Sequence, residues 1–176
     1  KTLLRWIKLS LTGSLLVLLL TFPQLASAQS IPPLPKSRTC HKDDVVGLWQ
    51  MRQIYQVPAG QELRMYQRFP SQYFLYRPDD TYMVYITTKN KQPPHEVFDQ
   101  MNQRKVPWLW QFIVDKSGFL FIYRNGKPVN SETEACFIVA KSTRDFDSGE
   151  MILMPPEGKV KERLVKVYKK IWTINK

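Results

Sequence analysis

Two histidines are the first candidates for acid–base or metal chemistry in this sequence. His95 and Glu96 begin the pattern H-E-x-x-H, in which two histidines one helical turn apart bind zinc and the glutamate acts as a general base. Asp99 stands where the second histidine is required, so the pattern is incomplete. His41 is adjacent to Cys40, but no C-x-x-C motif or second cluster of histidine and cysteine completes a metal site. The histidines therefore predict no zinc chemistry.

Carboxylates occur in two further places where catalysis or Ca²⁺ binding would be conceivable. Asp79 and Asp80 follow Pro78, at positions where aspartate is favoured in a tight turn. The loop 145–150 contains several carboxylates, but they lack the alternating oxygen ligands and closing glutamate of an EF-hand. The serine-hydrolase pattern G-x-S-x-G is absent as well. These residues favour a protein that is not an enzyme and that holds neither a metal nor a cofactor.

Cys40 and Cys136 are the two cysteines of the chain, and we predict that they form a disulfide. An even number of cysteines in an exported protein indicates pairing. Closing a loop of roughly 100 residues stabilises a fold by about 4–5 kcal/mol in the chain-entropy model. This prediction requires an oxidising compartment.

Residues 1–28 have the three-part layout of a secretory signal. Basic residues (Lys1, Arg5 and Lys8) precede a mostly apolar stretch with the unbroken aliphatic run 15–20, and Ala-Ser-Ala at 26–28 matches a signal-peptidase site. The segment predicts export to the periplasm or the exterior. Residues 9–28 are also long enough to span a bilayer if they are retained. A cleaved signal peptide and a retained signal-anchor helix, with its basic end in the cytoplasm, therefore both remain open.

Residues 29–44 form a Pro-rich linker, and a mostly β domain follows over 45–176. Aromatic and β-branched runs separated by turn residues predict short antiparallel strands, and Pro93-Pro94 starts a short helix. The strands are expected at 47–55, 63–69, 72–77, 81–87, 108–115, 119–124, 134–141, 151–154 and 163–172. Closure of such a meander removes exposed edges, so the predicted fold is all-β, an antiparallel barrel of about eight strands.

Aromatic residues gather on two of these strands. Trp108, Trp110 and Phe112 alternate on the first, and Phe119, Phe121 and Tyr123 alternate on the second. If the strands pair, the sequence predicts a continuous aromatic stripe on one face. The stripe would either fill the core or line a cavity for a hydrophobic ligand, which small barrels can hold.

Gly47-Leu48-Trp49 resembles the G-x-W motif at the first strand of lipocalins. The segments 74–82 and 163–170 are similar to a hairpin and the closing strand of small bacterial lipocalin-like domains, whereas the T-D-Y motif of the family is absent. The resemblance covers residues 45–172. It implies that Trp49 plugs the closed end of a barrel against a late basic residue, here Lys169 or Lys170 in place of the usual arginine. A disulfide from near the first strand to a late strand is in keeping with the family.

The formal net charge of +11 is concentrated near the C-terminus. The basic residues there are Lys159, Lys161, Arg163, Lys166, Lys169, Lys170 and Lys176. They form either a solvated strand edge, where lysines discourage edge pairing, or a surface for anionic lipids or an acidic partner. No nucleic-acid-binding motif accompanies them, so nucleic acid is not an expected partner.

Two functions follow from these features. The first is a non-enzymatic, extracytoplasmic lipocalin-like module that binds a hydrophobic ligand or acts as an accessory domain. The alternative is a structural subunit of a membrane protein complex. In that case residues 9–28 form a transmembrane anchor packed against other subunits, side chains fill the interior, and the β domain docks in the periplasm.

Overall fold

The computed structural model describes residues 32–57, 69, 71–89, 92–104, 110–129, 133–156 and 163–174. The N-terminal segment 1–28 and the expected strand 63–69, apart from residue 69, lie outside these ranges. The elements are β1 (Ser37–Thr39), α1 (Lys42–Val45), β2 (Gly47–Val57), β3 (Ser71–Tyr76), β4 (Tyr82–Thr87), α3 (Pro94–Gln103), β5 (Trp110–Val114), β6 (Phe119–Arg124), β7 (Lys127–Pro128), β8 (Glu134–Val139), β9 (Met151–Met154) and β10 (Arg163–Trp172).

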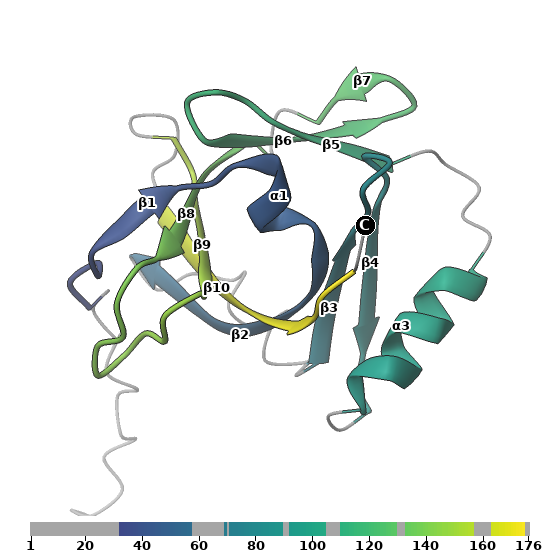
Figure 1. The fold of residues 1–176 in the computed structure, drawn as a ribbon, viewed down its shortest axis with the longest axis horizontal. Coiled ribbons are helices and arrows are strands. Elements are labelled where there is room, and N and C mark those ends of the chain that lie inside the picture. Colours follow the sequence, from purple (N-terminus) through teal and green to yellow (C-terminus); the bar gives the residue numbers. More distant parts are fainter. Residues whose placement is uncertain are drawn as a thin grey trace, which may run out of the picture.

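The fold is all-β and antiparallel, with one strongly curved sheet in the order β4-β3-β2-β10-β9-β8-β6-β5 (Figure 1). β1 adds to β8, and β7 adds to β6. The expected closed barrel is not formed by the described residues. The end strands β4 and β5 meet at a single bridge between Thr81 and Gln111 instead of a ladder. The ends approach only where the turn before β4 reaches β5, because the Phe112 amide donates to the Asp80 carbonyl there.

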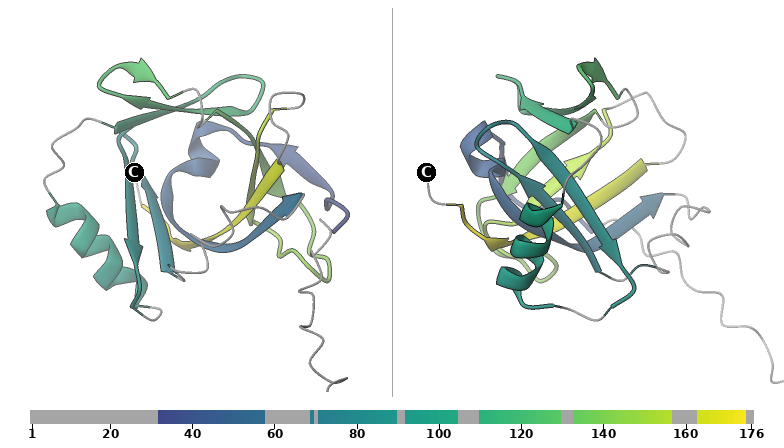
Figure 2. Two further views of the ribbon diagram at one scale, coloured as in Figure 1. Left: turned by 180° about the vertical axis from the view of Figure 1, so that it is seen from behind. Right: turned by 90° about the vertical axis from the view of Figure 1, so that its right-hand side faces the viewer.

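The linker expected at 29–44 is shorter than predicted. Its second half forms β1, which pairs with β8, and the one-turn helix α1. The backbone amide of His41 donates to the Asp44 carboxylate at 2.9 Å and starts this helix. Figures 1 and 2 show α1 within the curve of β2.

The concave face of the sheet holds the main core. Its centre is occupied by the large side chains of Trp49, Tyr76, Phe112 and Tyr168, each at most 2% exposed. Tyr76 and Phe112 pack edge to face with ring centroids 5.0 Å apart, as do Phe74 and Tyr168 at 5.0 Å. These aromatic contacts form the centre of the main core.

Two covers protect the convex face. α3 packs Val97 and Met101 onto outward residues of β2, β3 and β4, including Leu48, Leu75 and Tyr85. The loop after β8 places Phe146 over outward residues of β2, β9 and β10, which are Tyr55, Ile152, Val165 and Val167. The short helix predicted after Pro93 thus forms and serves as one of these covers.

Candidate functional site

Trp49 lies next to α1, inside the curved sheet. Its indole is 1% exposed, and its Nε1 donates to the Val45 carbonyl at 2.7 Å. Gly47, two residues earlier, has φ +141, and a Cβ there would lie 2.9 Å from the Trp172 carbonyl oxygen. Glycine is therefore required at this position, because a side chain would collide with the backbone of the last strand.

Lys170 completes this arrangement. Its Nζ donates to the Asp44 and Val46 carbonyls at 2.7 and 2.9 Å and lies 4.7 Å from the centroid of the Trp49 ring. Burial lowers the pKa of Lys170, and the nearby Asp44 opposes that shift. Lys169, the other candidate from the sequence, is exposed. We call the assembly of α1, Trp49 and Lys170 the plug.

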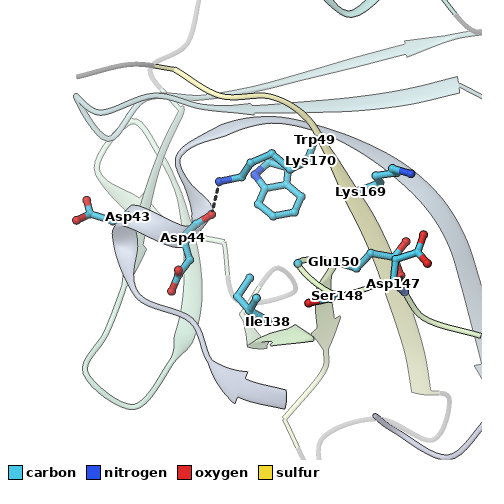
Figure 3. A pocket seen from close by; sticks show the side chains of 10 residues that line it. Asp43, Asp44, Trp49, Ile138, Asp147, Ser148, Glu150, Lys169 and Lys170 are labelled. Atoms are coloured by element: carbon cyan, nitrogen blue, oxygen red, sulfur yellow. Dashed lines mark hydrogen bonds between the residues drawn. The ribbon is translucent and has the colours of Figure 1, made fainter. Parts of the chain in front are cut away.

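A pocket of about 480 Å³ lies beside the plug (Figure 3). It is lined by Asp43, Asp44, Trp49, Ile138, Asp147, Ser148, Gly149, Glu150, Lys169 and Lys170. Two of the carboxylates are already paired. Arg38 binds Asp44 at 2.6 and 2.7 Å, and Arg52 binds the buried Glu150 at 2.6 and 2.9 Å. Its lining combines these charged side chains with the apolar side chains of Trp49 and Ile138.

The predicted aromatic stripe is wrong. β5 and β6 pair with Trp110 opposite Arg124, Phe112 opposite Ile122 and Val114 opposite Leu120. Cross-strand partners share a face, so Trp110 and Phe112 point into the core while Phe119, Phe121 and Tyr123 point outward. The turn Asp115–Gly118 sets this register, because the Asp115 carboxylate accepts the Ser117 and Phe119 amides. Trp108 lies outside the described residues.

The basic C-terminal strand is not the continuous surface patch that its composition suggested. Alternate residues of β10 face inward. On this face Lys166 forms an ion pair with Glu134 at 2.8 Å, and Lys170 forms part of the plug. Lys169 is exposed, whereas Lys159, Lys161 and Lys176 lie outside the described residues, as does the side chain of Arg163. The two-residue spacing of Lys166, Tyr168 and Lys170 is the signal that could have identified the shared face.

The other candidate polar residues have structural roles. Asp79 accepts from the Thr81 amide and hydroxyl at 3.0 and 2.6 Å, which holds the turn before β4 and lowers the pKa of Asp79. Asp80 has φ 68 and pairs with Lys42. Within the described ranges no three His, Cys, Asp or Glu side chains are grouped to hold a metal ion. His95 is exposed on α3.

The disulfide between Cys40 and Cys136 is confirmed, and it fixes the chain entering α1 to β8. It is consistent with an oxidising, extracytoplasmic compartment. In the part of the chain that the structure describes, no helix has the length and apolarity needed to cross a membrane.

Comparisons with protein-family models, with curated proteins and with solved structures find no match to this chain.

Proposed function

We propose that this protein is a non-enzymatic, extracytoplasmic accessory module that is tethered to a membrane and acts through its surface, as a docking subunit does. The filled core is the observation that carries the proposal. Tyr76, Phe112 and Tyr168 lie in the core on the concave face of the sheet, and each is at most 2% exposed. A hydrophobic ligand would have to displace side chains that are already closely packed.

The plug supports a lipocalin-like relationship at one end of the domain. A buried tryptophan from a G-x-W motif lies under a basic residue of the last strand, as the resemblance implies. The relationship concerns the scaffold, and one scaffold serves many functions. The features that support a docking function are the filled interior and the N-terminal segment. That segment combines a basic start with an apolar run long enough to span a bilayer.

The tether is tested with the full chain in bacterial membranes washed with alkaline carbonate. We expect the protein to stay in the pellet and, after mild detergent, to co-purify with membrane proteins. A matched variant with Leu16→Arg and Leu18→Arg places two charges in the apolar run, which costs about 2.5–3.5 kcal/mol each at a helix centre. It should appear in the supernatant. Release of the unaltered protein would refute the tether.

The filled interior is tested by titrating the protein with a fluorescent fatty-acid analogue. We expect no saturable, one-to-one binding. A fatty-acid-binding protein titrated under the same conditions is the positive control. Stoichiometric binding by the unaltered protein would restore hydrophobic ligand binding as the leading function.

A further inference from the structure

We draw no further inference here: the strongest candidate, the apolar surface patch of Val84 and Ile86 that the end strand β4 leaves exposed, carries no proposal because nothing in the structure shows what covers it.

Discussion

Lys170 lies directly over Trp49, with its ammonium nitrogen 4.7 Å from the centre of the indole ring. The same ammonium donates to two backbone carbonyls at the end of α1, those of Asp44 and Val46. One side chain of the last strand therefore binds the helix that closes the sheet and the tryptophan beneath it. Residues from both ends of the domain meet here, so the plug also ties the termini of the fold together.

Replacing Lys170 with methionine should destabilise the domain by about 1–3 kcal/mol, since two carbonyls lose a charged donor while the aliphatic stem is kept. Urea unfolding measures the change. Lys169→Met, one residue earlier and exposed, is the control and should change stability by less than about 0.5 kcal/mol. Equal effects of the two variants would contradict the role of Lys170 in the plug.

Acid should weaken the start of α1. Hydrogen bonding to Arg38, with help from the His41 amide, holds the pKa of Asp44 below its usual range. A carboxylate whose pKa is lowered by folding contributes its full stabilisation of the fold at pH values above its unfolded pKa of about 4. That contribution is lost as the pH falls through the folded value. Asp79, whose pKa is lowered chiefly by the Thr81 hydroxyl, adds to the same loss.

The measurement is the urea midpoint between pH 2 and 6. Asp44→Asn should be less stable than the unaltered protein at pH 6 and should lose less stability on acidification. Asp99→Asn, on the exposed side of α3, should follow the unaltered protein throughout. If Asp44→Asn lost as much stability between pH 6 and pH 2 as the unaltered protein does, the Asp44 carboxylate would contribute nothing to this pH dependence.

Removal of the disulfide should cost about 4–5 kcal/mol in the chain-entropy model, because it links residues separated by 96 positions. The double variant Cys40→Ser with Cys136→Ser, compared with the oxidised protein by urea unfolding, measures the loss. Thiol titration of the denatured, unreduced protein should find no reactive groups. Two reactive thiols per chain would contradict the bond.

The sequence was sufficient for those features whose signals are local. Hairpin turns and alternating residues predicted the antiparallel strands, and Pro93-Pro94 predicted α3. The two cysteines were enough to predict their pairing, because no competing cysteine exists. β1 and α1 were missed, because three and four residues are too short to show a periodic pattern.

Features that depend on pairing between distant segments could not be predicted in this way. The pairing of Lys166 with Glu134 follows from the order β10-β9-β8, which no single segment specifies. The pair formed by Arg52 and the buried Glu150 joins residues 98 positions apart. Barrel closure failed as a prediction because it depends on how far β4 and β5 align along their edges.

The orientation of the β5–β6 hairpin gives the sharpest test of the fold. Phe112 is 0% exposed, lies opposite Ile122 and packs on Tyr76. Phe112→Ala should therefore cost about 3–5 kcal/mol.

Phe121, opposite Ile113 on the outward face, is the matched variant on the neighbouring strand. Phe121→Ala should cost about 1 kcal/mol or less, as expected for a side chain outside the core. Urea unfolding of both proteins measures the difference. A slip of one residue in this pairing would exchange the two faces, so the opposite order of stabilities would show that the aromatic residues of β6 line the interior. The core would then have to be rebuilt around Phe119, Phe121 and Tyr123.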